Sequence, residues 1–191
     1  MIFDTAGNLY GTTYFGGPAQ GSNGSLFKIA AGSNTITTLA SFTGSNGLHP
    51  HGTLIQDAAG NLFGTTVAGG ANNVGTVFEL TADTNTLITL ATFNVTNGSF
   101  PYGGLVADAS GNLYGTTSSG GLNGEGTVFE ITGAGFVVPE PGIITLCPIV
   151  FMGLIRRRRG ARRDTTSAMD NLPSRRNVFK LLPVLDDRIR T

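Results

Sequence analysis

Three Asp-x-x-Gly-Asn segments are the first feature of this 191-residue chain whose residue types could do chemistry. Each segment places a carboxylate and an amide oxygen on one tight loop, and Ca²⁺ accepts both kinds of oxygen. Each offers only one carboxylate, however, whereas an EF-hand loop offers several. We therefore interpret them as structural turns, in which Asp accepts backbone N–H bonds and Gly takes a positive φ. The turn residues are Asp4, Gly7 and Asn8, then Asp57, Gly60 and Asn61, then Asp108, Gly111 and Asn112.

Two histidines, His49 and His51, could bind a metal or act in acid–base chemistry. A metal site needs a third ligand at suitable spacing, but the chain has no other histidine, and its single cysteine lies in an apolar stretch. In an internal alignment the histidines occupy the positions of Phe100 and Tyr102, beside an equivalent proline. We expect their rings to pack at the entrance of a strand, and we predict neither a metal nor a cofactor.

Glu79 and Glu130 occupy the same position in successive repeats, which suggests the paired carboxylates of glycoside hydrolysis. Lys28 fills that position in the first repeat, so we expect a solvent-facing strand position that tolerates either charge. The serines lack the Gly-x-Ser-x-Gly context of a nucleophile elbow. The Gly-Gly loops precede no predicted helix that would hold a phosphate. The sequence therefore predicts a protein that is not an enzyme.

The turns belong to a long repeat, because Asp-x-x-Gly-Asn-Leu-Tyr/Phe-Gly-Thr-Thr occurs at residues 4–13, 57–66 and 108–117. The aspartates are 53 and 51 residues apart, and the difference lies in the loop between Gly17 and Phe27. A fixed period of this length is typical of propellers and other repeat architectures. We place the units at about 1–49, 50–100 and 101–134.

Each unit contains four short apolar and β-branched runs bounded by Gly, Asn, Asp or Pro, which predicts four antiparallel strands. In the second unit the runs are residues 52–56, 61–67, 75–81 and 87–93. Four strands in about fifty residues match a propeller blade. We predict an all-β fold, a partial β-propeller of about three four-stranded antiparallel blades, with Phe27, Phe78 and Phe129 in the core. The Thr-Thr pairs could form an array for ice or glycan contact, although β-propensity explains them equally well.

Charge divides the chain into two segments. Residues 1–155 contain one lysine and eight acidic residues, whereas residues 156–191 contain eleven basic and four acidic residues. An acidic repeat region offers almost no cations to phosphates, so nucleic acid is not an expected partner.

The pattern Pro-x-Gly-x-Leu, Asp-x-x-Gly-Asn-Leu-Tyr/Phe-Gly-Thr-Thr, Gly-Gly, Val-Phe-Glu-Leu/Ile-Thr resembles the GloVer tandem repeats of bacterial proteins that carry varied surface anchors. The resemblance implies a propeller-like fold and export. Propellers close with about four to eight blades, and the third unit reaches Val-Pro-Glu-Pro before its fourth strand. The N-terminus also lacks the pattern of a secretory signal. We therefore expect the chain to be the C-terminal part of a longer protein, or one copy in a ring.

The next segment, residues 135–163, resembles a PEP-CTERM sorting signal. Its motif, residues 138–142, contains Val138, Pro139, Glu140 and Pro141; the hydrophobic run is 142–155; and the basic cluster, residues 156–163, begins with Arg156, Arg157, Arg158 and Arg159. The resemblance implies recognition by an exosortase-type enzyme, a short hydrophobic helix in the inner membrane, and arginines that hold the end in the cytoplasm. The run is shorter than a bilayer span, so spanning would recruit residues 136–138. We expect the tail, 164–191, to be disordered.

The sequence thus predicts a non-catalytic surface or extracellular-matrix protein, exported across the inner membrane of a Gram-negative-type bacterium. It would be anchored transiently and then reach the cell surface, where its propeller loops contact a polysaccharide or a surface protein. One alternative is the C-terminal fragment of an exported polysaccharide-acting enzyme. A lower-ranked alternative is a passive spacer.

Overall fold

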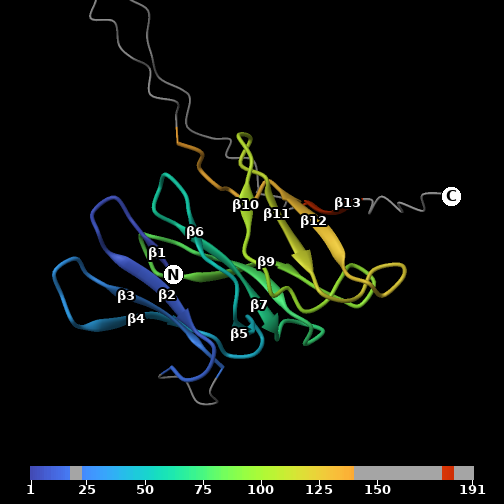
Figure 1. Cartoon of the computed structure of the whole chain (residues 1–191), viewed down its shortest axis with the longest axis horizontal. Coiled ribbons are helices and arrows are strands. Elements are labelled where there is room, and N and C mark those ends of the chain that lie inside the picture. Colours follow the sequence, from blue (N-terminus) through green and yellow to red (C-terminus); the bar gives the residue numbers. More distant parts are fainter. Residues whose placement is uncertain (18–22, 140–177, 183–191) are drawn as a thin grey trace, which may run out of the picture. The chain divides into compact units, whose positions relative to one another are not determined.

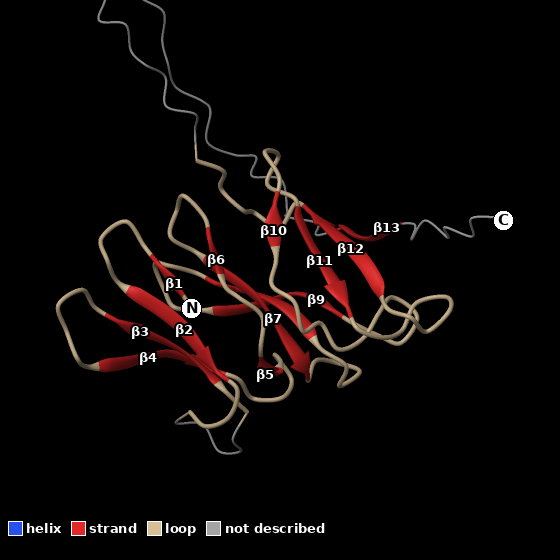
Figure 2. Cartoon of the chain, viewed as in Figure 1, coloured by secondary structure: helices blue, strands red, loops and turns tan. Residues whose placement is uncertain are grey.

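The computed structural model describes residues 1–17, 23–139 and 178–182, and all regular elements among them are strands (Figures 1 and 2). The strands are β1 (Ile2–Phe3), β2 (Leu9–Thr13), β3 (Ser25–Ile29), β4 (Ile36–Ser41), β5 (Leu48–Pro50), β6 (Ile55–Gln56), β7 (Leu62–Ala68), β8 (Thr76–Leu80), β9 (Leu87–Thr92), β10 (Val106–Ala107), β11 (Leu113–Thr117), β12 (Thr127–Thr132) and β13 (Val178–Leu182). The predicted all-β class is confirmed for this part of the chain. The hydrophobic helix expected at residues 142–155 lies outside the described residues.

Three antiparallel sheets follow one another along the chain (Figure 1). The first has the order β1-β2-β3-β4, the second β5-β7-β8-β9 with β6 also paired to β7, and the third β10-β11-β12-β13. Each predicted repeat therefore supplies most strands of one sheet, and each Asp-x-x-Gly-Asn turn joins two of these strands in a hairpin. The short strand β5 was not expected from the sequence, since it contains His49 and Pro50.

The fourth strand of the third sheet comes from the tail, in a departure from the expected disorder at residues 178–182. Strand β13 pairs antiparallel with β12, with Glu130 opposite Lys180 and Ile131 opposite Phe179. In the other sheets the fourth strand, β4 or β9, directly follows the third. The third repeat turns away before such a strand, so the outer edge of β12 pairs with a more distant segment. The rest of the tail lies outside the described residues.

Buried phenylalanines join consecutive sheets. Phe42 meets Phe78 between the first and second sheets at a ring-centroid distance of 5.1 Å, and Phe93 meets Phe129 between the second and third at 5.0 Å. Both pairs have the edge-to-face geometry that aromatic rings favour. Two hydrophobic clusters surround them: Leu26, Phe42, Leu54, Leu62, Phe78 and Leu80, and Phe63, Val77, Phe93, Leu105, Leu113, Phe129, Ile131 and Ala134.

The predicted core positions are confirmed for Phe78 and Phe129, which are fully buried, but Phe27 is only half-buried. Side chains alternate between the two faces of a strand. Leu26 faces the second sheet, so its neighbour Phe27 lies on the outer face of the first sheet. Among the described residues no sheet covers that face, and the ring stays partly exposed.

The Thr-Thr pairs do not form a regular exposed array, so that interpretation is wrong. Thr65, Thr66 and Thr117 are buried. The Oγ1 atoms of Thr66 and Thr76 lie 2.8 Å apart, and those of Thr117 and Thr127 lie 2.9 Å apart. These hydroxyls hydrogen-bond to each other across neighbouring strands, which satisfies them inside the sheets.

Candidate functional site

The three Asp-x-x-Gly-Asn turns share one hydrogen-bonded geometry. In the second turn Asp57 Oδ1 accepts the backbone N–H groups of Ala59 and Asn61 at 2.9 and 2.8 Å, and Oδ2 accepts Asn61 Nδ2 at 2.9 Å. Gly60 has a φ of 88° and donates its N–H to the Asp57 carbonyl at 3.1 Å. A residue with a Cβ adopts this left-handed backbone only with strain. Asp and Gly therefore define the loop that starts β7.

The first and third turns add a tyrosine hydroxyl to the same carboxylate. Tyr10 donates to Asp4 Oδ2 at 3.2 Å, and Tyr114 lies 3.1 Å from Asp108 Oδ2. Hydrogen bonds from the following asparagine hold the pKa of both carboxyls below the usual value, by its side chain first at Asp4 and by its backbone N–H first at Asp108. These donors occupy most of the acceptor positions that Ca²⁺ would need. The part of the chain that the structure describes contains no group of three His, Cys, Asp or Glu side chains arranged to hold a metal.

The second turn holds the segment that leads out of the repeats. Val137 donates its backbone N–H to Asp57 Oδ2 at 3.2 Å, and its carbonyl accepts the N–H of Ala58 at 2.9 Å. The ring of Phe136 packs on Phe63 with centroids 5.2 Å apart. Recruitment of residues 136–138 into a membrane span is thus not what the structure shows, because the ring of Phe136 packs on the repeats and the backbone of Val137 hydrogen-bonds to them.

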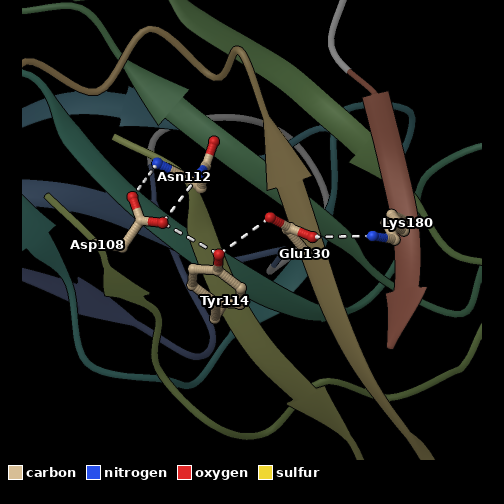
Figure 3. Close-up of polar contacts among 5 residues, drawn as sticks. All are labelled: Asp108, Asn112, Tyr114, Glu130 and Lys180. Carbon is tan, nitrogen blue, oxygen red and sulfur yellow. Dashed lines mark hydrogen bonds and ion pairs between the residues drawn. The ribbon is translucent and has the colours of Figure 1, made fainter. Parts of the chain in front are cut away.

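The third turn continues into a chain of polar contacts that reaches the tail (Figure 3). The hydroxyl of Tyr114 lies 3.0 Å from Glu130 Oε1, and Glu130 Oε2 lies 4.0 Å from Lys180 Nζ on β13. The hydrogen bond to Glu130 is the main cause that raises the pKa of Tyr114 to about 12, with Asp108 contributing in the same direction. One hydroxyl proton is shared between two carboxylates.

Glu79, the counterpart of Glu130 in the second repeat, is buried with an exposed fraction of 2%, so the expected solvent-facing position is wrong there. Glu79 shares a face of β8 with Val77, which the third sheet covers. Glu130 lies instead on the outer face of its own sheet, beside the partly exposed Val128. The two carboxylates therefore lie on different sheets, Glu79 on β8 and Glu130 on β12. In the first repeat Lys28 lies 5.5 Å from the ring centroid of Tyr10.

A group of aromatic side chains gathers at the end of β2 opposite the Asp4 turn. We call it the aromatic cluster, and it consists of Tyr14, Phe15, His49, His51 and Tyr102. Tyr14 stacks on His49 with centroids 4.6 Å apart and planes at 5°. Phe15 meets the edge of His49 at 5.1 Å, and His51 meets Tyr102 at 5.3 Å. The predicted ring packing of the two histidines is therefore present.

Much of the aromatic cluster is open to solvent. Phe15 is 63% exposed and Tyr102 is 47% exposed. His49 and its counterpart Phe100 both have a φ of 56°, so the same backbone bend presents a ring in each repeat. Sequence reasoning missed Tyr14 and Phe15, although a signal existed. They stand where the second repeat has Val67 and Ala68 and the third has two serines.

The sorting-signal residues fall mostly outside the described part of the chain. Val138 and Pro139 are described, and Pro139 is exposed. Glu140, Pro141 and the cluster Arg156, Arg157, Arg158 and Arg159 lie outside the described residues. Among the residues that are described, the structure contains no helix long and apolar enough to cross a membrane.

Comparison with known families identifies the family to which the three repeats are similar. Residues 1–138 match the sequence model of the Gloeobacter/Verrucomicrobia repeat, which confirms the resemblance to GloVer repeats. The match covers all three repeats, from β1 to the segment that packs on the Asp57 turn. A comparison with curated proteins finds no match.

Proposed function

The chain belongs to the Gloeobacter/Verrucomicrobia repeat family, and we propose that it is a non-catalytic, exported repeat protein that binds carbohydrate on the aromatic cluster. The observation that carries the proposal is the exposed ring of Phe15 beside the stacked pair Tyr14 and His49. Rings that serve a core are buried, as Phe78 is. Exposed apolar groups that gather in one place mark interaction sites.

The chemistry of the aromatic cluster suits a sugar. The C–H face of a pyranose packs on an aromatic ring, while its hydroxyls need polar neighbours. The tyrosines and histidines of the aromatic cluster offer both, since each has an apolar body and a polar tip. His51 Nδ1 lies 3.2 Å from the Tyr102 carbonyl, which favours one orientation of this ring. Of the two partners considered, a polysaccharide or a surface protein, we favour the polysaccharide.

The proposed architecture is a β-propeller of which the three sheets are successive blades. The repeated Phe42–Phe78 and Phe93–Phe129 junctions support it, because one geometry recurs between each pair of sheets. The half-buried Phe27 supports it as well, since its face would pack on a further blade. A further blade from the same protein or from another copy would bury that ring.

We also propose the PEP-CTERM route, with processing by an exosortase-type enzyme, transient anchoring in the inner membrane and release to the cell surface. The order of the Pro-Glu-Pro motif, apolar run and arginines supports it. The contacts of Phe136 and Val137 with the repeats support it too, since the motif at residues 138–142 begins directly after them and its Pro139 is exposed.

Glycan binding by the full chain tests the proposed ligand. We expect an immobilised bacterial polysaccharide or glycan array to retain the full chain, and Phe15→Ala to weaken retention about tenfold, the loss of a central aromatic contact. The matched control is Phe3→Ala, because Phe3 is 72% exposed and precedes the Asp4 turn at the other end of β2. Equal retention of Phe15→Ala and the parent chain would reject the site, and absence of retention on any glycan would reject the ligand class.

Processing is tested separately in a host that contains an exosortase. Replacement of Pro139, Glu140 and Pro141 by alanine should block maturation while the repeats stay folded. If the triple variant has the same mature size as the parent chain, the sorting route is contradicted. The glycan-binding proposal is not affected by that outcome.

A further inference from the structure

We propose that the outer edge of β12 is a strand-binding site for an apolar segment with a central lysine, and that the Val178–Leu182 segment of a second copy takes this site when the chain's own segment leaves it. In this structure the chain's own β13 occupies the edge along five residue pairs. Recognition of a strand by β12 and exchange of that strand between copies are both independent of the glycan site.

The outer edge of β12 pairs with a segment that is distant in the sequence, Val178–Leu182. In the first two sheets the third strand continues through a short turn into the fourth. After β12 the chain instead runs to Phe136, whose ring packs on Phe63 of the second repeat, and to Val137, whose backbone hydrogen-bonds to Asp57. Backbone groups at a strand edge need partners, and an unpaired edge recruits extended segments from other chains.

Residues 140–177 connect β13 to the repeats along the chain. A tether of this length makes the pairing intramolecular and raises the effective concentration of the segment near the edge. The five-residue ladder carries one ion pair between side chains, Glu130 with Lys180 at 4.0 Å. Such a short strand binds weakly once it is no longer tethered, so the occupant is exchangeable.

The Glu130 carboxylate makes the edge of β12 selective for a segment with a central lysine. Glu130 lies opposite Lys180 in the ladder, and its side chain is 12% exposed, so a carboxylate sits beside the position of the central residue. The corresponding strand positions in the other sheets are Thr37 opposite Lys28 and Ile88 opposite Glu79. A cation facing the third-strand residue is thus particular to the third sheet. Directly opposed like charges destabilise a strand pair, so an acidic segment is disfavoured here.

The charges of the chain favour the tail of a second copy as the other occupant. Residues 1–155 carry one lysine and eight acidic residues, and residues 156–191 carry eleven basic and four acidic residues. The tail of one copy is therefore attracted to the repeats of another. Its segment 178–182 already fits the register of β12. Cleavage at residues 139–141, which rests on the proposed function, would remove β13 and open the edge.

The experiment uses the full chain with Leu181→Pro, because proline supplies no N–H to a ladder and its ring fixes a φ that suits an extended strand poorly. The control is Leu185→Pro, which lies in the same tail beyond β13. We expect amide hydrogen exchange at residues 127–132 to be at least tenfold faster in Leu181→Pro than in the control, while the near-ultraviolet circular dichroism of the two is alike. Equal exchange rates would overturn the proposal.

A labelled peptide that corresponds to residues 177–183 then tests exchange in trans. It should bind the Leu181→Pro chain, restore slow exchange at residues 127–132, and bind the parent chain at least tenfold more weakly, because the parent's edge is occupied. A peptide with Lys180→Glu should bind about tenfold more weakly than the native peptide. Combining that peptide with Glu130→Lys in the chain should recover binding. Failure of the native peptide to bind, or equal binding of both peptides, would overturn the proposal.

A second variant keeps the test valid if Leu181→Pro disturbs the fold. A protease site inserted between residues 164 and 174 of the full chain allows the tether to be cut after folding. We expect the cut tail to dissociate on dilution and to be replaced by the labelled peptide. A tail that stays bound at every dilution would show that the occupant is permanent, and would overturn the exchange. None of these measurements involves an exosortase or a glycan.

Discussion

Gly64 of β7 lies opposite Phe78 of β8, and the ring of Phe78 fills the space that a Cβ atom on Gly64 would need. An ideal Cβ there would stand 2.6 Å from Phe78 Cζ. The same pairing recurs as Gly11 with Phe27 and as Gly115 with Phe129. The glycine of Leu-Tyr/Phe-Gly-Thr-Thr is therefore required by a ring on the neighbouring strand rather than by a turn.

Gly64→Ala should destabilise the protein by about 1–3 kcal/mol, because Phe78 is fully buried and cannot move away from an added methyl group. Gly11→Ala is the matched control, since its Cβ would also stand 2.6 Å from a phenylalanine Cζ atom. Phe27 is half-buried on an outer face, so its ring can shift, and the loss should be smaller. Urea unfolding measures both, and equal losses would contradict this account.

Phe78→Ala should cost about 3–5 kcal/mol of unfolding free energy, because it leaves a cavity between the first two sheets, where Phe78 contacts Phe42. Phe27→Ala removes the same side chain from a half-buried position and should cost clearly less. The two variants are compared in one denaturant titration. A larger loss for Phe27→Ala would mean that the outer face of the first sheet is covered in solution.

Asp57→Asn tests the turn that also holds the outgoing segment. The amide keeps an oxygen for Ala59 and Asn61, but its NH₂ group would face the N–H of Val137 and the side-chain NH₂ of Asn61. Because Asp57 is buried, we expect a loss of about 1–3 kcal/mol. Amide exchange at Val137 should also become faster.

Asp4→Asn is the control for that substitution, since the first turn has the same Asp–Asn hydrogen bonds, its carboxylate is more exposed, and among the described residues no outgoing segment bonds to it. It should lose less stability than Asp57→Asn. An unchanged exchange rate at Val137 in Asp57→Asn would show that the carboxylate does not hold this segment.

The repeat sequence predicts most of the fold because its signals are local. Apolar and β-branched runs bounded by turn residues identify strands such as β7 and β8, and Asp-x-x-Gly-Asn identifies the hairpin between β6 and β7. The repeated position of Phe78 and Phe129 likewise predicts two buried rings, because each packs on a phenylalanine of the preceding sheet. Phe27 has no preceding sheet among the described residues, and it is only half-buried.

What the sequence does not predict depends on contacts between distant segments. Strand β13 is a five-residue run whose pairing with β12 leaves no periodic signal, and short apolar runs fit helix or strand equally well. The burial of Glu79 depends on which face the third sheet covers. The aromatic cluster likewise depends on contacts between two sheets, because Tyr14 follows β2 of the first sheet and His49 lies in β5 of the second.

Tyr114 gives a prediction at high pH. Its pKa is raised to about 12 from 10.0, first by the hydrogen bond to Glu130, because a phenolate beside two carboxylates is disfavoured. A group whose pKa is raised by folding contributes stability that is complete below pH 10 and is lost as the pH rises through about 12. Ultraviolet titration of phenolate should show a step near pH 12 that is missing in Tyr114→Phe. In Glu130→Gln the step should move toward pH 10, since the amide is uncharged, and a step that stays near pH 12 would exclude Glu130 as the main cause.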